Sequence, residues 1–237
     1  MCVLYRPAAH ARVARPMRYI RGAMTLPPGE PDSPHAVAAW VRERSREHDR
    51  YAAISDASDA HRIEHGPACT VYATSSGPLL GALAAATHAK RILEIGTGLG
   101  YSALWLADGS APHGIVDSIE RDAAHIDLAR DVFARHGIDT RVRLHHGSAI
   151  EVLPRLPGPY DLIFSDSDVD EYADTLEHSV RLLRTGGLLI TSNLFLGQYT
   201  ADVSGIDQAI AYRDRIIDDA RLRTAFTPTG LALSVRV

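Results

Sequence analysis

The sequence predicts an α/β fold, in which helices cover both faces of a seven-stranded, mostly parallel sheet with a C-terminal antiparallel strand. An apolar run at 92–95 is followed by three glycines and by a new apolar pattern from Tyr101, which is typical of a strand, a turn and a helix. Strand and helix signals then alternate, as a doubly wound sheet requires. The last two apolar segments, 222–226 and 231–237, are close enough in sequence to pair antiparallel.

Each element is assigned from its apolar pattern and from the residues that stop it. Gly137 stops the helix at 123–136, and a glycine pair at 186–187 stops the helix at 170–183. The predicted strands are 92–95, 114–119, 141–145, 160–165, 188–192, 222–226 and 231–237, and the predicted helices are 79–86, 101–107, 123–136, 150–153, 170–183 and 205–220.

Length and composition suit a soluble globular protein of one large domain or of one and a half small domains. The chain has 237 residues, of which 46% are hydrophobic, so it can bury a core of ordinary size. Its net charge is −4 and its basic residues are scattered, which gives no support for a nucleic-acid-binding surface. The cysteines, Cys2 and Cys69, have neither zinc-site spacing nor the pattern of a disulfide framework, which favours a reducing cytoplasm. No apolar run reaches the roughly 18 residues of a membrane span.

Residues 1–34 are predicted to form a disordered, basic and proline-rich tail. Five arginines precede the first acidic residue, Glu30, and four prolines punctuate the end of the segment. Such a stretch resembles a transit peptide, but we favour an over-long start, with translation beginning at Met17 or Met24.

Residues 35–70 are predicted to be N-terminal accessory helices that precede the main domain at 71–237. Apolar residues recur with helical spacing at 35–49, whereas 50–70 is mixed and rich in small polar residues. These helices either cover a cofactor and shape a substrate pocket or only pack on the domain.

The glycine turn points to a particular cofactor. Its pattern is Glu94-x-Gly96-x-Gly98-x-Gly100, in which the third glycine comes one residue earlier than in the dinucleotide fingerprint. An acid before the first glycine with this spacing indicates S-adenosylmethionine. A tight connection that binds nothing is the alternative. Glu120 argues against it, because it ends the next strand, where an acid accepts hydrogen bonds from the ribose hydroxyls.

Three motifs over 72–237 resemble those of the cation-dependent O-methyltransferases, the class I family of catechol and caffeoyl-CoA O-methyltransferases. Residues 90–102 are similar to the first family motif, including its Gly-Tyr-Ser ending. Residues 147–154 resemble its Gly-Asp-Ala-x-Glu-Val-Leu-Pro segment, and 160–168 resemble its fourth-strand motif. The resemblance implies a Rossmann-like methyltransferase domain, S-adenosylmethionine as cofactor and a homodimer.

Position by position, the resemblance implies a set of cofactor-binding residues. Glycines admit the ligand closely, a carboxylate matches the ribose diol, and acids at strand ends suit the sulfonium and amino groups. The set is Glu94, Gly96, Thr97, Gly98 and Ser102 around the methionine part, Glu120 at the ribose, Ser148 and Ala149 beside the adenine, Asp166 and Asp168 closing the site, and Tyr72 through its backbone.

Two positions depart from the family pattern. Val169 stands where the family has a lysine that acts as general base, and Ser192 replaces the aspartate of an Asp-Asn pair that completes the metal site. Carboxylate oxygens hold a hard cation such as magnesium, so the serine should weaken metal binding considerably. The metal ligands that remain are Asp166 and Asn193.

The nearby acids leave the metal question open. Asp168, Asp170 and Glu171 could supply the missing oxygen by rearrangement, but acids at a helix start are explained as well by the helix dipole.

No catalytic residue is assigned from the sequence. The sulfonium is already activated, so methyl transfer mainly requires alignment of a nucleophile with the methyl group. His178, Tyr172 and Asp170 are the nearest candidates for a base, and each is better explained as a helix surface residue or as core packing. His145 and His146 are not expected to chelate a metal together, because adjacent strand residues point to opposite faces.

We therefore predict an S-adenosylmethionine-dependent O-methyltransferase that acts on a small hydroxylated molecule and has a degraded metal site. One alternative is another acceptor such as transfer RNA, which the weak basic character disfavours. The other is a cofactor-binding protein without turnover. The acceptor stays unassigned, because neither the accessory helices nor the loop 196–204 carries a recognisable motif.

Overall fold

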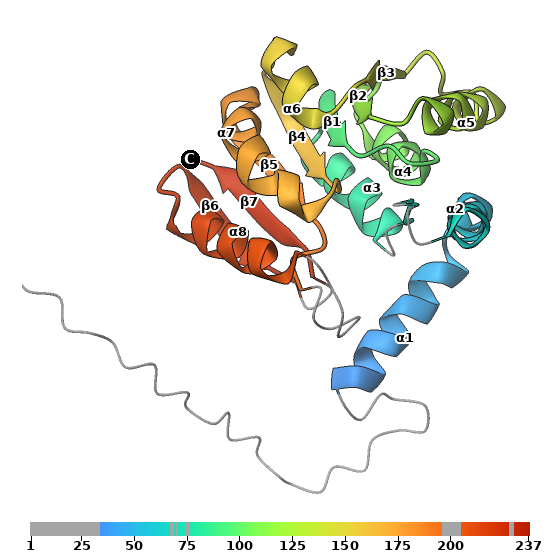
Figure 1. Ribbon diagram of the computed structural model, residues 1–237, viewed down its shortest axis with the longest axis horizontal. Coiled ribbons are helices and arrows are strands. Elements are labelled where there is room, and N and C mark those ends of the chain that lie inside the picture. The colour runs from blue at the N-terminus through green and yellow to red at the C-terminus, as the bar shows by residue number, and fades with distance from the viewer. Residues whose placement is uncertain (1–33, 67–68, 70, 74–75, 196–204, 228–229) are drawn as a thin grey trace, which may run out of the picture.

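The computed structural model describes residues 34–66, 69, 71–73, 76–195, 205–227 and 230–237. Its centre is a seven-stranded sheet with the order β3-β2-β1-β4-β5-β7-β6, shown in Figure 1. Two predictions lie outside the described residues: the tail at 1–34, apart from its last residue, and the loop at 196–204.

The predicted mixed sheet is confirmed. The five strands β3-β2-β1-β4-β5, in their order across the sheet, pair in parallel with their neighbours. Strand β7 is antiparallel to both β5 and β6. The strands are β1 (Arg91–Ile95), β2 (Ile115–Glu120), β3 (Val142–His146), β4 (Tyr160–Ser165), β5 (Leu183–Thr191), β6 (Leu222–Phe226) and β7 (Ala232–Arg236).

Strand β5 begins earlier than predicted. The predicted strand begins at 188, whereas the observed strand begins at Leu183. Leu183 is fully buried and pairs with Tyr160, and the pairing then skips to Leu188 opposite Leu162. The glycine pair at 186–187 therefore lies in an irregularity within the strand. It does not mark the end of a helix.

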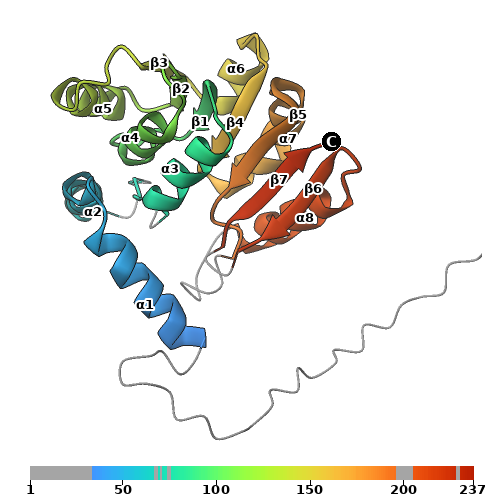
Figure 2. The ribbon, with the colours of Figure 1, turned by 180° about the vertical axis from the view of Figure 1, so that it is seen from behind.

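Helices cover both faces of the sheet, as Figures 1 and 2 show. Side chains of α3, α4 and α5 share one hydrophobic core, and those of α6, α7 and α8 share the other. The helices are α1 (Pro34–Glu47), α2 (Ala52–His65), α3 (Gly77–Ala86), α4 (Tyr101–Gly109), α5 (Ala123–Arg135), α6 (Ala149–Val152), α7 (Tyr172–Leu182) and α8 (Ile206–Asp218), with the 3₁₀ turns η1 (Leu153–Arg155) and η2 (Val169–Glu171).

Alternation along β1 shows why the strand carries apolar residues on both of its faces. Ile92 belongs to the core under α3 and α4, whereas Leu93 and Ile95 belong to the opposite core. Successive side chains of a strand point to opposite faces, so a central parallel strand is buried on both.

The accessory segment docks onto α4 just before α2 begins. Asp49 accepts hydrogen bonds from the Tyr101 hydroxyl at 2.5 Å and from the Trp105 indole at 3.2 Å. The Tyr51 ring packs edge-on against Trp105. These contacts fix α2 beside the carboxyl edge of the sheet, whereas α1 extends away from it in both views.

No helix in the described part of the chain combines the length and the apolar character that crossing a bilayer requires.

Candidate functional site

The carboxyl ends of the parallel strands bring most of the predicted site residues to one edge of the sheet. The glycine turn follows β1, Glu120 ends β2, and Asp166 follows β4. In open α/β sheets this edge is where ligands bind.

The glycine turn needs its glycines. Gly96, Gly98 and Gly100 all have positive φ angles, of 96°, 52° and 90°. A side chain at Gly96 would lie 2.5 Å from the Asp166 carbonyl oxygen, and one at Gly100 would lie equally close to Phe133. At Gly98 it would meet only Val71 among the described residues, at 3.7 Å. The turn is therefore tightly packed at Gly96 and Gly100 and open at Gly98, where a ligand can approach the backbone.

Glu120 is held against this turn. One of its carboxylate oxygens accepts the Gly98 N–H and the other accepts the Asp122 N–H, each at 2.9 Å. The Nδ1 atom of His125 lies 3.7 Å from the second oxygen. Each carboxylate oxygen can accept two hydrogen bonds, so this nearly buried side chain has acceptor capacity left for a diol.

Glu94 is a fully buried carboxyl in β1. Its Oε2 atom accepts the Ser118 hydroxyl at 2.5 Å, and Ser118 also pairs with the hydroxyl of Thr97. Its Oε1 atom has no hydrogen-bond partner among the described residues. Burial raises the pKa of Glu94 to about 8, although the hydroxyls of Ser102 and Ser118 favour the charged form. An unpartnered buried oxygen of this kind suits a cationic group of a ligand.

The predicted adenine residues begin α6. Ser148 caps this helix through a reciprocal capping box with Glu151, and Ala149 is buried behind it. The preceding histidines do not converge, as expected. His145 contacts Asp117 at 2.9 Å, and His146 contacts the Arg121 carbonyl oxygen at 3.2 Å.

Tyr72 is mostly exposed, and the Arg62 guanidinium lies 4.8 Å from the centre of its ring. Its neighbour Val71 is buried and faces Gly98, so the backbone of this segment runs beside the glycine turn. No sequence signal singled out Val71.

Asp168 forms an ion pair with Arg121 at 2.6 Å, which links the ends of β4 and β2 across β1. Arg121 could not be identified from the sequence, because an arginine after a strand belongs to no motif. Val169 packs against the core beneath α7 and α8, so a hydrocarbon occupies the position of the family's base.

The three candidate bases differ in exposure and in hydrogen bonding. Tyr172 is fully buried and donates its hydroxyl to the Ser192 carbonyl oxygen at 3.2 Å. Asp170 is exposed beside α7, and His178 lies partly exposed within that helix.

The predicted metal ligands, Asp166 and Asn193, are hydrogen-bonded to each other. A single oxygen of Asp166 accepts both the Ser192 hydroxyl and the Asn193 amide N–H, the latter at 2.8 Å. Burial raises the pKa of Asp166 to about 6. One carboxylate that already accepts two hydrogen bonds is a poor donor set for a divalent cation, which prefers several oxygen ligands. The residues at this position do not fit the family's metal.

The chain is similar in sequence to known O-methyltransferases. A family model described as O-methyltransferase matches residues 57–236. A probable O-methyltransferase of Mycobacterium tuberculosis strain H37Rv is 40% identical over 160 residues, which cover 65% of this chain and 71% of the relative.

Solved structures are also similar to this chain over most of its length. Cofactor-bound Rv0187 from MTB has a TM-score of 0.73 and 29% identity, and the match covers 87% of this chain and 99% of that one. TomG from Streptomyces achromogenes is an O-methyltransferase involved in tomaymycin synthesis, crystallised in complex with SAM. It has a TM-score of 0.67 and 26% identity over 83% of this chain and 98% of its own.

Proposed function

The chain belongs to the O-methyltransferase family, and we propose that it methylates a hydroxyl of a small molecule without a divalent cation at Asp166 and Asn193. Its methyl donor is S-adenosylmethionine, the cofactor of the similar enzyme TomG. The observation that carries the proposal is the edge of the sheet where Glu94, the open glycine turn and Glu120 meet.

The residues at this edge fit S-adenosylmethionine. The unpartnered oxygen of Glu94 suits the amino group of the methionine part, and Glu120 has acceptor capacity for two ribose hydroxyls. When bound, the cofactor supplies a methyl group on a sulfonium. We assign the remaining contacts to the residues that the family motifs name: Tyr72, Gly96, Thr97, Gly98, Ser102, Ser148, Ala149, Asp166 and Asp168.

Cofactor binding is expected to release a proton from Glu94. The pKa of Glu94 is about 8 in the free protein, so the carboxyl is mostly protonated at pH 7. A neighbouring ammonium favours the charged form and lowers this pKa, so affinity should rise with pH up to about 8. Calorimetry at pH 7 in buffers of different ionisation enthalpy should show more protons released by the natural chain than by Glu94→Gln, with a difference of at most about one proton. Equal release by both proteins would contradict the contact.

The natural acceptor is expected to be an acidic hydroxyl such as a phenol. Val169 cannot take a proton, so the nucleophile has to lose its own to solvent before it meets the methyl group. Alignment then does most of the remaining work.

Activity is expected not to depend on magnesium, because the Asp166 carboxylate is paired with Ser192 and Asn193. Labelled S-adenosylmethionine is incubated with catechols, flavonoids and bulk transfer RNA after treatment with EDTA, and magnesium or zinc is then added back. We expect labelled phenol with or without magnesium. Activity that EDTA abolishes and magnesium alone restores would refute the metal-independent proposal. Labelled RNA would refute the proposal of a small-molecule acceptor. Cofactor binding without any turnover would refute the proposed methyl transfer.

From composition and family resemblance we also propose that the chain forms a homodimer, binds no nucleic acid and acts in the cytoplasm.

A further inference from the structure

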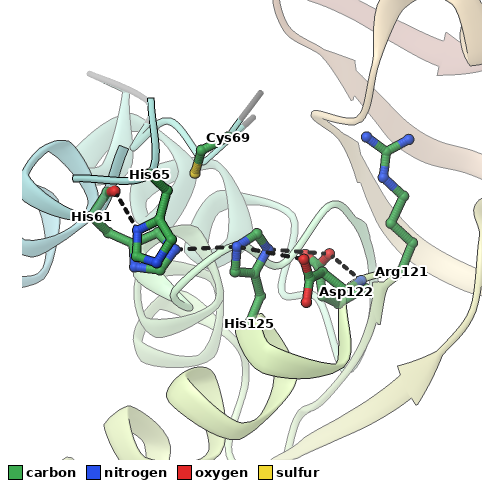
Figure 3. Close-up of a pocket in the computed structure, with 7 residues that line it drawn as sticks. His61, His65, Cys69, Arg121, Asp122 and His125 are labelled. Atoms are coloured by element: carbon green, nitrogen blue, oxygen red, sulfur yellow. Dashed lines mark hydrogen bonds and ion pairs between the residues drawn. The ribbon is translucent and has the colours of Figure 1, made fainter. Parts of the chain in front are cut away.

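A cluster of histidine and cysteine side chains lies beside the cofactor edge, between α2 and α5. His61 on α2, Cys69 after it and His125 on α5 each offer one donor atom, and the three atoms all lie within 4.8 Å of one another. The Nε2 atoms of the two histidines are 3.3 Å apart. Figure 3 shows these side chains converging on one cavity of about 250 Å³.

This distance pattern matches tetrahedral coordination. Zinc binds histidine nitrogen at about 2.0–2.1 Å and cysteine sulfur at about 2.3 Å, which places neighbouring ligand atoms roughly 3.3–3.7 Å apart. The histidine pair already has this spacing. The whole triad needs a contraction of about 1 Å at most, which side-chain rotation can supply.

The donor types select the ion. Two imidazoles and a thiolate are borderline-to-soft ligands that suit zinc and do not suit magnesium or calcium. The surroundings also favour a cation, because Glu120 and Asp122 line the same cavity with Arg121 as the single arginine among its lining residues. The Asp122 carboxylate lies 4.0 Å from His125 Nε2, where it or a water can take the fourth position.

The second nitrogen of His125 is oriented as a metal ligand requires, and the ring of His61 is packed in place. His125 turns its Nδ1 atom towards the Glu120 carboxylate, 3.7 Å away, which is the arrangement of a carboxylate behind a metal-bound histidine. The ring of His65 stacks on His61 at 4.0 Å, and its Nδ1 atom contacts the His61 carbonyl oxygen. His65 therefore positions His61 from one helical turn away.

We propose that His61, Cys69 and His125 bind one zinc ion, which fastens the accessory helix α2 to α5 beside Glu120. Glu120 borders both sites, but none of the three ligands is assigned to S-adenosylmethionine, so zinc binding can be measured separately from the proposed activity. A histidine pair that only shares a proton is the competing explanation for the short nitrogen–nitrogen distance.

Cobalt(II) replaces zinc in such sites and reports on the ligands. Added to the metal-free full chain, one equivalent of cobalt is expected to give visible bands of tetrahedral coordination and a near-ultraviolet thiolate-to-metal band, and zinc should then displace it. The thiolate band should vanish in Cys69→Ser, and zinc affinity should fall about 100-fold or more in Cys69→Ser and in His61→Gln. Circular dichroism of the metal-free proteins checks that the variants fold.

Matched controls separate this site from adventitious binding. Cys2→Ser removes the only other cysteine, and His88→Asn changes an exposed histidine at a positive φ angle that asparagine tolerates. Both should bind zinc as the natural chain does. The proposal would be overturned if the natural chain does not bind one equivalent of zinc. It would also be overturned if the thiolate band survives in Cys69→Ser. Calorimetry with S-adenosylmethionine on the same zinc-free sample shows separately whether the cofactor site is intact.

Discussion

Replacing Glu120 by alanine is expected to raise the dissociation constant of S-adenosylmethionine about 100-fold or more. Each hydrogen bond from a ribose hydroxyl to a buried carboxylate contributes about 1.5–3 kcal/mol, so losing two costs at least 3 kcal/mol. The substitution also removes the acceptor of the Gly98 N–H, which loosens the glycine turn at the position where it is open to a ligand. Isothermal titration calorimetry measures the change directly.

Two further variants make this result specific. Glu120→Gln keeps the shape and one good acceptor, so we expect an intermediate loss of about 10-fold. Glu177→Ala removes an exposed carboxylate of α7 that pairs with Arg221, far from the glycine turn, and should leave cofactor affinity unchanged. If Glu120→Ala folds normally and binds the cofactor as tightly as the natural chain, the ribose assignment is wrong.

The sheet could be predicted because its evidence is local. A strand buried on both faces is a continuous apolar run, so Ile92 and Leu93 identify β1 although they face opposite cores. The bounds of helix α2 within the predicted accessory helices at 35–70 could not be assigned, because it buries only Ile54 and Ser58 and exposes its other large apolar side chain, Ile63. Its position depends on Asp49 and Tyr51, which dock on α4 through contacts distant in sequence.

The site shows the same contrast between residues that local sequence identifies and contacts between residues distant in sequence. Gly96 follows β1 directly and Glu120 ends β2, so spacing alone placed them at the carboxyl edge. The ion pair between Arg121 and Asp168 joins residues 47 positions apart and leaves no pattern in the sequence. The zinc ligands are hidden for a related reason. The two cysteines lack metal-site spacing, and His125 reaches Cys69 only because α2 packs beside α5.

Replacing Ser192 by aspartate is expected to create a magnesium site that the natural chain lacks. The new carboxylate would lie against Asp166, whose oxygen now accepts the serine hydroxyl, with Asn193 as a third oxygen ligand. Two carboxylates and an amide suit a hard cation, so magnesium affinity should rise about 100-fold over the natural chain. Without metal the two like charges repel, and the free energy of unfolding should fall by about 2 kcal/mol.

Thermal unfolding with and without magnesium tests this directly. Ser192→Asp should melt below the natural chain in EDTA and recover when magnesium is added, because an ion that binds only the folded state stabilises it. Ser192→Asn keeps a neutral side chain and should show no dependence on magnesium. The natural chain should behave like Ser192→Asn, since its only carboxylate at this position is already paired. If the natural chain gains as much stability from magnesium as Ser192→Asp does, then Asp166 and Asn193 suffice to hold the ion and the serine is not what removed it.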